Sequence, residues 1–236
     1  MGADRLEAIE QEFKRRYRKK KLVNLLISAV IALSGAIAVA YIWRYDGDGL
    51  LTFRWMTVDG TVFTAVIALF YVAVNLVELA RYTELTSRLV YFTRLAAAVA
   101  EGLILVVVLL SQLPFSPQHM HLLRFDMFQM HVLIPLLTIA SFLLNDSPIG
   151  RLNWRQKLHG TWFVTLYAAV ILTLIGTQII PTEEIPYFFL DVAHLPLLSA
   201  LGCFCFIYGL SYLLACLFSR WNRKLSWLWF KGVAGK

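Results

Sequence analysis

Residues 14–43 read KRRYRKKKLVNLLISAVIALSGAIAVAYIW, a basic run followed directly by a long apolar stretch. An α-helix needs about 20 mostly apolar residues to cross the hydrocarbon core of a bilayer. A cleavable signal peptide has a shorter apolar region and a small-residue cleavage site after it, and this stretch has neither. The pattern therefore predicts a transmembrane helix over residues 22–43 with a basic segment at its edge.

The composition extends this prediction to the whole chain of 236 residues. Apolar residues make up 59% of it and charged residues 16%, whereas about 25% of the residues in a typical soluble domain are charged. A disordered chain is poor in apolar residues, so this composition excludes disorder as well. Five further apolar stretches of spanning length follow, at residues 57–80, 90–113, 126–145, 159–181 and 193–218. Their continuous apolar character favours helices over membrane strands, and we expect an all-α, polytopic membrane protein with six transmembrane helices.

The basic residues predict the orientation of this bundle. Of the 22 Lys and Arg residues, 19 fall in the segments on one side of the six spans, and only Arg44, Arg54 and Arg124 fall on the other side. Cytoplasmic segments carry the excess of Lys and Arg, so we expect both termini in the cytoplasm. The net charge of +7 then indicates an anionic membrane surface rather than nucleic acid as the partner.

The same reading divides the chain into three parts. We expect a basic, amphipathic, helical cytoplasmic segment over residues 1–21, a six-helix transmembrane domain over 22–218, and a cytoplasmic tail over 219–236. A bacterial plasma membrane is the preferred location. The sequence does not reveal the oligomeric state.

The second predicted span opens with MTVDGTVFT, residues 56–64. Thr57, Thr61 and Thr64 are spaced so that they share one helix face, and Asp59 points elsewhere. Each threonine hydroxyl could instead bond to the carbonyl four residues earlier, as is common in such helices. Asp59 lies near the outer interface, where it could simply be solvated.

The fourth predicted span contains MHVLIP, residues 130–135. Pro135 cannot donate to the carbonyl of His131, so we expect a kink that opens space beside the imidazole. A histidine that merely bonds to a neighbouring helix is the simpler alternative. The topology places His131 and Thr57 in the same leaflet, and a hydroxyl nucleophile needs a nearby base, most often histidine. The two residues therefore form a candidate catalytic pair.

Other polar residues give weaker signals. In the third outer loop, Tyr187 and Asp191 are four residues apart and would share a face if the segment were helical. Glu101, Glu78 and Asn75 lie within spans, where such groups indicate interhelical hydrogen bonds or an ion or proton path. No metal site is expected. Cys203 and Cys205 face different ways on a helix, so they are not expected to share a metal ion. His119 and His121 lack two further ligands nearby.

Three short motifs, in order, resemble a known family. They are FRWMTVDGTVFTAV (residues 53–66), MHVLIPLL (130–137) and IPYFFLD (185–191). Together they resemble the androgen-induced-protein family of six-span membrane proteins, over a region from about Arg54 to about Phe218. Animal members of that family are hydrolases of fatty acid esters of hydroxy fatty acids. The resemblance implies the same roles here for Thr57 as nucleophile and His131 as its partner.

The resulting hypothesis is hydrolysis of a lipid ester through an acyl-threonine, with His131 as the base and no metal or organic cofactor. Arg54, Trp55 and Tyr187 are candidates by location for stabilising the oxyanion. Asp191 is a candidate for orienting His131, with Asp59 and Asp126 as alternatives. These candidates all lie near the outer face in the predicted topology.

Two alternatives to hydrolysis stay open. The first is a transporter, or a non-catalytic protein that binds a lipid or another ligand, using Glu101, Glu78 and Asn75 along a path. The second is a structural partner of another membrane protein. A pocket open to the outer leaflet, with Thr57 and His131 within hydrogen-bond reach, favours the hydrolase. A polar channel through Glu101 toward the inner face favours transport. A bundle without an internal cavity, in which Thr57 and His131 are satisfied separately, favours the structural role.

Overall fold

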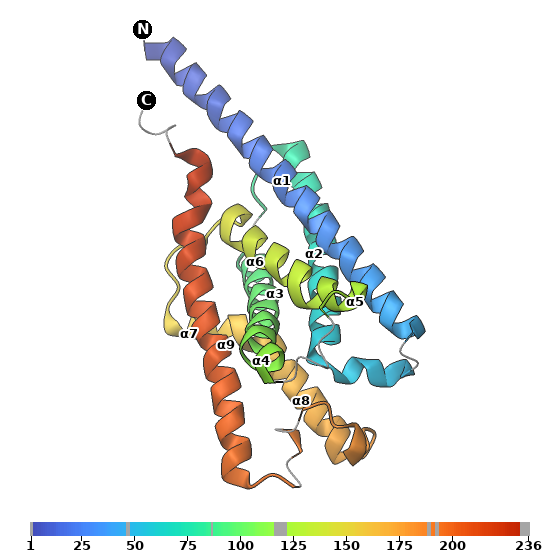
Figure 1. Ribbon diagram of the computed structural model, residues 1–236. Helices are drawn as coiled ribbons and strands as arrows, with labels where there is room; N and C mark the ends of the chain where they lie inside the picture. Colours follow the sequence, from blue (N-terminus) through green and yellow to red (C-terminus); the bar gives the residue numbers. More distant parts are fainter. Residues whose placement is uncertain are drawn as a thin grey trace.

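The computed structural model describes residues 2–45, 48–85, 87–115, 122–187, 190–191 and 194–231. The chain is 85% helical, with no strand among these residues. Figure 1 shows an elongated bundle in which the helices run at modest angles to one another. The all-α fold class expected from the sequence is thereby confirmed.

Six helices of the described residues are long and apolar enough to cross a membrane, in agreement with the six predicted spans. Two are simple helices, α2 (Met56–Arg81) and α9 (Leu197–Leu225), and α9 continues into a 3-10 turn, η8 (Ser226–Phe230). The next three are composite. They are α3 (Arg88–Val107) with η2 (Val108–Gln112) and α4 (Leu113–Phe115); α5 (Phe125–Phe128) with η4 (Gln129–Leu133) and α6 (Ile134–Asn145); and α7 (Trp154–Leu158) with η5 (His159–Thr161) and α8 (Trp162–Gly176).

The first helix, α1 (Gly2–Tyr45), has 44 residues and no break where residues 1–21 were expected to form a separate segment. It packs along α2. The two backbones approach so closely that a Cβ on Gly35 would lie 2.8 Å from the Cβ of Ala65. Since no side chain fits into that space, glycine is required there for the contact between the two helices.

Helix α3 occupies the middle of the bundle, between α1 and α2 on one side and α8 and α9 on the other (Figure 1). Its Ala-rich segment, Leu95–Val99, is fully buried. Small side chains allow neighbouring helices to pack closely in a membrane, where no hydrophobic force draws them together. By contrast, the outer faces expose large apolar side chains, such as Leu33, Leu69 and Phe206, as expected of surfaces that face lipid.

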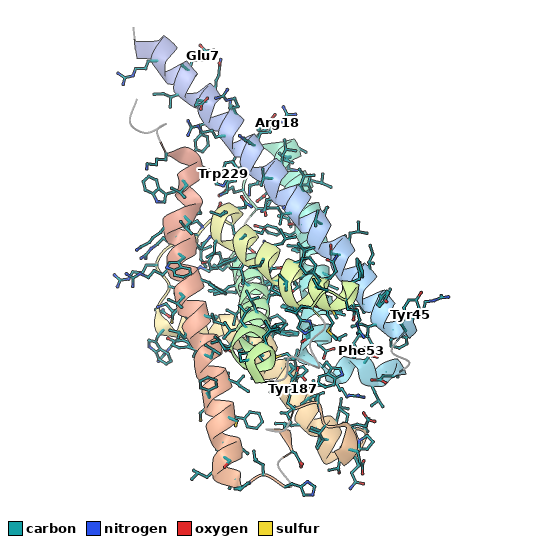
Figure 2. All side chains as sticks on the ribbon, in the orientation of Figure 1. Glu7, Arg18, Tyr45, Phe53, Tyr187 and Trp229 are labelled. Atoms are coloured by element: carbon teal, nitrogen blue, oxygen red, sulfur yellow. The ribbon has the colours of Figure 1, made fainter. Side chains whose placement is uncertain are left out.

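Two loops near the start of α2 each contain a 3-10 turn. These turns are η1 (Gly49–Arg54) and η6 (Thr182–Glu184). Figure 2 shows Tyr45, Phe53 and Tyr187 toward the same end of the bundle, and Arg18 and Trp229 toward the other end. The loop motif that contains Tyr187 is therefore brought to the same end as the motif that opens α2.

Candidate functional site

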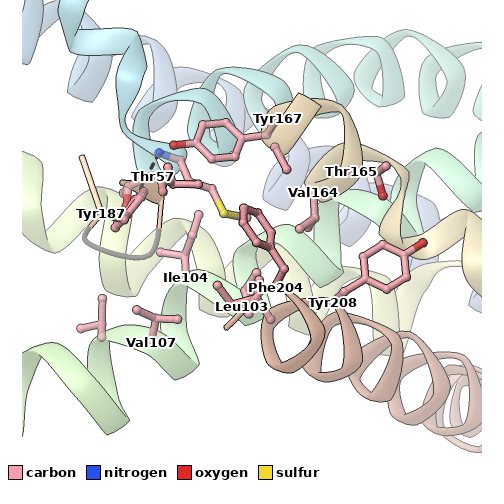
Figure 3. A pocket seen from close by; sticks show the side chains of 15 residues that line it. Thr57, Leu103, Ile104, Val107, Val164, Thr165, Tyr167, Tyr187, Phe204 and Tyr208 are labelled. Carbon is pink, nitrogen blue, oxygen red and sulfur yellow. Dashed lines mark hydrogen bonds between the residues drawn. The ribbon is translucent and has the colours of Figure 1, made fainter. Parts of the chain in front are cut away.

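A cavity of about 180 Å³ lies where the start of α2 meets α3, α8, α9 and the loop before α9 (Figure 3). Its walls are largely apolar, with Leu103, Val107, Val164 and Phe204 among them. None of its 15 lining residues is charged. The polar side chains that line it all carry hydroxyl groups. They are Thr57, Thr165, Tyr167, Tyr187 and Tyr208. An apolar hollow with a few hydroxyl groups suits the hydrocarbon part of a lipid and one weakly polar functional group.

Thr57 lies on the wall of this cavity, in the first turn of α2. The helix starts there because Trp55 is extended, with φ −87° and ψ 124°, and the following residues are helical. Gly60, one turn later, approaches α3, and a Cβ on it would lie 2.9 Å from Ile104 Cδ1. Thr61 and Thr64 are fully buried, do not line the cavity and make no bond to the carbonyls four residues earlier. Thr57 is therefore the member of the predicted threonine face that reaches open space.

Tyr187 lies beside Thr57 (Figure 3). Its phenol oxygen accepts a hydrogen bond of 3.2 Å from the backbone N–H of Met56, and its ring meets the Trp55 ring edge-on, with centroids 5.7 Å apart. Burial raises the pKa of Tyr187 to about 12, although hydrogen bonds with the Met56 backbone and the Thr57 side chain act in the opposite direction. The phenol therefore keeps its proton at neutral pH and remains a hydrogen-bond donor.

Tyr167 holds the same turn from α8. Its hydroxyl donates a hydrogen bond of 2.6 Å to the backbone carbonyl of Arg54. Together with the bond between Tyr187 and Met56, this contact fixes the backbone on both sides of Trp55. Both tyrosines line the cavity, so the turn that presents Thr57 is held by side chains from two other parts of the chain.

His131 lies in η4, a π-helical turn that ends at Leu133, two residues before Pro135. The missing N–H of Pro135 accounts for this local change in helix geometry. The open space expected beside the imidazole is not part of the cavity, which His131 does not line. The imidazole is 6% exposed, and its Nδ1 lies 3.0 Å from the carbonyl oxygen of Met127. Because a carbonyl only accepts, Nδ1 must carry the proton, which leaves Nε2 with a lone pair. This is the tautomer that a general base requires.

The segments that carry Thr57 and His131 are neighbours. Val58 and Met130, the residues next to them in sequence, pack in one buried cluster with Ala38 and Ile42. His131 is not among the residues that line the cavity, and no hydrogen bond joins it to Thr57 in the part of the chain that the structure describes. The structure thus brings the two segments together without joining the two side chains.

The proposed supporting residues make other contacts. Arg54 forms ion pairs with Asp48 at 3.2 Å, across η1, and with Glu184 at 2.9 Å, which ties η1 to η6. Asp191 accepts from His194 Nδ1 at 2.9 Å. The backbone N–H of Asp59 donates to the Trp55 carbonyl at 3.1 Å, and within the described residues its side chain makes no hydrogen bond. None of the three lines the cavity. Asp126, the alternative partner of His131, is held bidentately by Arg124, at 2.7 Å and 2.5 Å.

A second group of polar residues connects five helices away from the cavity. Lys21 of α1 pairs with Glu78 of α2 at 2.7 Å, and Arg94 of α3 pairs with Asp146 at 2.9 Å. All four side chains are at most 1% exposed. Their charges satisfy one another, and we call this group the buried ionic network.

Amides and hydroxyls complete the buried ionic network. Ser141 accepts from Arg94 at 2.7 Å and donates to Asn24 at 2.8 Å. Asn24 in turn donates to Asn75 at 3.5 Å, and Asn222 donates to two carbonyls of the Phe142–Asp146 segment at 2.8 Å. The interhelical hydrogen bond that the sequence indicated for Asn75 is therefore present, whereas Glu78 makes an interhelical ion pair with Lys21. Sequence reasoning missed the partners, because Asn24 lies 51 residues from Asn75 and Lys21 belongs to another helix.

Glu101 lies apart from both groups. It is fully buried in the middle of α3 and faces Thr64 of α2. It does not line the cavity, and its carboxylate makes no ion pair within the described residues. His119 and His121, which were considered for metal binding, lie outside the described residues.

Tyr208 and Thr165 form a second polar end of the cavity that the sequence did not suggest (Figure 3). Thr161 at the start of α8 donates to the Tyr208 hydroxyl at 3.1 Å. These residues stand in apolar helices without a neighbouring motif, and only the packing of α8 against α9 brings them together.

Comparisons with known proteins found no matching family model, no matching curated protein and no matching solved structure.

Proposed function

We propose that this chain is an integral-membrane hydrolase of lipid esters in which Thr57 is the nucleophile. The observation that carries the proposal is the position of Thr57, at the polar end of an apolar cavity and beside the Tyr187 phenol. The apolar walls suit an acyl chain, and the hydroxyl group suits attack on its carboxyl carbon. The resemblance of the three sequence motifs to a family of lipid ester hydrolases supports the same assignment.

In this mechanism Nε2 of His131 removes the proton from the Thr57 hydroxyl, and Oγ forms a bond to the ester carbonyl carbon. The bond to the alcohol then breaks, and the departing alkoxide takes the proton from His131. The Tyr187 phenol donates a hydrogen bond to the oxyanion and keeps its proton, while its oxygen accepts a hydrogen bond from Met56 N–H. Water, with His131 again as the base, hydrolyses the acyl-threonine and restores the enzyme.

The mechanism requires the imidazole and the Thr57 hydroxyl to come within hydrogen-bond distance during turnover. Two features support this requirement. Val58 and Met130 already pack together, and the bond from Nδ1 to the Met127 carbonyl leaves Nε2 as the acceptor. Catalytic hydrogen bonds are often long in a ligand-free enzyme and shorten only when substrate is bound.

The test is hydrolysis of a panel of lipid esters by the purified full chain in detergent micelles. We expect Thr57→Ala and His131→Ala to lower kcat by about 10³-fold or more, as removal of a nucleophile or its base does in other hydrolases. Two threonines are matched controls. Thr61→Ala changes the same helix face one turn deeper, and Thr165→Ala changes the far end of the cavity. Undiminished turnover by a folded Thr57→Ala variant would falsify the mechanism.

A second function, non-catalytic lipid binding, is favoured by the uncharged lining and by the position of His131 outside it. That function predicts that lipid copurifies equally with the wild type and with Thr57→Ala, and that no ester in the panel is hydrolysed. Transport through Glu101 has less support, because Glu101 does not line the cavity.

We further infer that both termini are cytoplasmic, from the 19 Lys and Arg residues on their side of the spans. A bacterial plasma membrane is the location that we propose. Labelling of introduced cysteines with an impermeant reagent tests the orientation. A cysteine at position 231 should react only after the membrane is opened, and one at position 50 should react in intact cells.

A further inference from the structure

A second hollow, of about 520 Å³, lies further along α9 than the cavity. One wall is the last part of α9, and the other is the segment that leads into α7. Five cations line it, namely Arg151, Lys157, Arg220, Arg223 and Lys224. No acidic residue is among the described residues that line it. We call this site the basic hollow.

The cations of the basic hollow have no acidic partner among the described residues. None of the five forms an ion pair in the portion of the chain that the structure describes. By contrast, Lys14 and Arg16 on α1 pair with Glu10 and Glu12. The positive charges of these five side chains are therefore available to an external anion.

A neighbouring hollow gives an internal comparison. It shares Arg223 with the basic hollow and also contains Lys14 and Lys20, but Glu10 and Glu84 line it as well. The two acids offset most of its charge. Cations at the C-terminal end of a helix are also favoured by the helix dipole, which accounts for Arg223 and Lys224 on α9. That effect does not account for Arg151 and Lys157, which come from other elements and face the same space.

Two apolar side chains also line the hollow. Leu152 and Leu217 line it together with the cations, and Leu152 is 8% exposed. These residues belong to or adjoin helices that are apolar enough to cross a membrane. A ligand that carries both a phosphate and hydrocarbon chains satisfies both parts of this lining, whereas a free phosphate satisfies only the cations.

We propose that the basic hollow binds the phosphate headgroup of an anionic phospholipid from the leaflet on the side of the chain termini. The arginines donate hydrogen bonds to the phosphate oxygens, and the two leucines contact the glycerol and the first methylenes of the acyl chains. The site is separate from the cavity of Thr57 and does not depend on the proposed hydrolysis.

The experiment is native mass spectrometry of the full chain in detergent, titrated with phosphatidylglycerol or with phosphatidylcholine. The wild type should bind phosphatidylglycerol at least about tenfold more tightly, because its headgroup has a net negative charge whereas the choline of phosphatidylcholine cancels the phosphate charge, and each cation near an anionic lipid contributes roughly a fivefold gain. The double variant Arg151→Gln/Arg220→Gln removes one cation from each wall and should lose most of this preference. Arg151→Gln alone, in an exposed loop segment, should show a partial loss even if the double variant fails to fold.

The matched control is Arg155→Gln/Arg18→Gln, which removes the same charge outside the hollow. Arg155 lies over the Trp154 ring and does not line the hollow. Full preference in this control, together with its loss in the hollow variants, supports the site. Equal loss in the control would reduce the effect to general surface charge and would overturn the proposal. Displacement of the lipid by millimolar inorganic phosphate would also overturn it, because the occupant would then be a soluble anion.

Discussion

The cavity and the buried ionic network use polar residues in opposite ways. In the network, Lys21, Glu78, Arg94 and Asp146 are paired with one another, and amides and hydroxyls join them across five helices. In the cavity, uncharged hydroxyl groups face open space among apolar walls. Polar groups that satisfy one another in a bilayer hold helices together, whereas polar groups that face a cavity can act on a ligand. The buried ionic network is therefore the candidate for joining the helices, and the cavity is the candidate for function.

The largest expected effect comes from breaking a pair in the buried ionic network. Arg94→Met leaves the Asp146 carboxylate buried without its partner at 2.9 Å. We expect a loss of about 3–5 kcal/mol in the free energy of unfolding, measured by SDS titration in mixed micelles. The double variant Arg94→Met/Asp146→Leu should recover most of the loss. A single variant as stable as the wild type would mean that this pair does not hold the bundle together.

At the cavity, Tyr187→Phe tests function rather than stability. It removes the proposed oxyanion donor and the acceptor for Met56 N–H. We expect kcat for ester hydrolysis to fall by about 10²-fold or more, and the free energy of unfolding to fall by only about 1 kcal/mol. Tyr208→Phe, at the far end of the same cavity, is the control and should keep kcat within about threefold of the wild type. An equal loss of kcat in both variants would show that Tyr187 is not the oxyanion donor.

Filling the space distinguishes the cavity from the packed core. Ala168 lines the cavity, so Ala168→Phe should be accommodated with less than about 1 kcal/mol change in unfolding free energy, while it excludes lipid and lowers turnover. Ala215 is fully buried against the Gly160 turn. Ala215→Phe should therefore cost about 1–3 kcal/mol. If both variants lost the same unfolding free energy, the region around Ala168 would be as tightly packed as the core, and the cavity could not hold a lipid.

The smallest effect is expected from the ion pairs of Arg54, one across η1 and one from η1 to η6. Arg54 pairs with Asp48 and Glu184, whose side chains are 41% and 42% exposed. Exposed pairs contribute about 0.2–1 kcal/mol, and we expect a change of this size for Glu184→Gln in the same SDS titration. A loss comparable to that of Arg94→Met would show that the loops, and not only the buried ionic network, carry the stability of the fold.

The sequence predicted one part of this picture well. Apolar runs of spanning length specify six helices because each must satisfy its own backbone in lipid, and the threonine face of α2 follows from its spacing alone. Asn75 and Glu78 were recognisable as interhelical contacts because amides and carboxylates in a span need partners.

The remaining features depend on contacts between distant segments. Arg94 was counted only as a basic residue near a membrane edge, since Asp146 lies 52 residues away. The cavity lies between α3, α8 and α9, which are distant in sequence, and no local sequence pattern predicts it. The position of Tyr187 beside Thr57 likewise depends on a loop that crosses from α8 to α9, so the sequence indicated only a shared membrane face.

The central claim is that the Thr57 hydroxyl attacks an acyl carbonyl from the wall of the cavity. Its most direct test is to incubate the purified full chain with an alkyl fluorophosphonate and to locate the adduct by peptide mass spectrometry. The account predicts loss of fluoride and a phosphonyl group on Thr57 Oγ, absent in Thr57→Ala and much slower in His131→Ala. An active wild-type preparation that carries no adduct on Thr57, or that carries it on another residue, would contradict the claim.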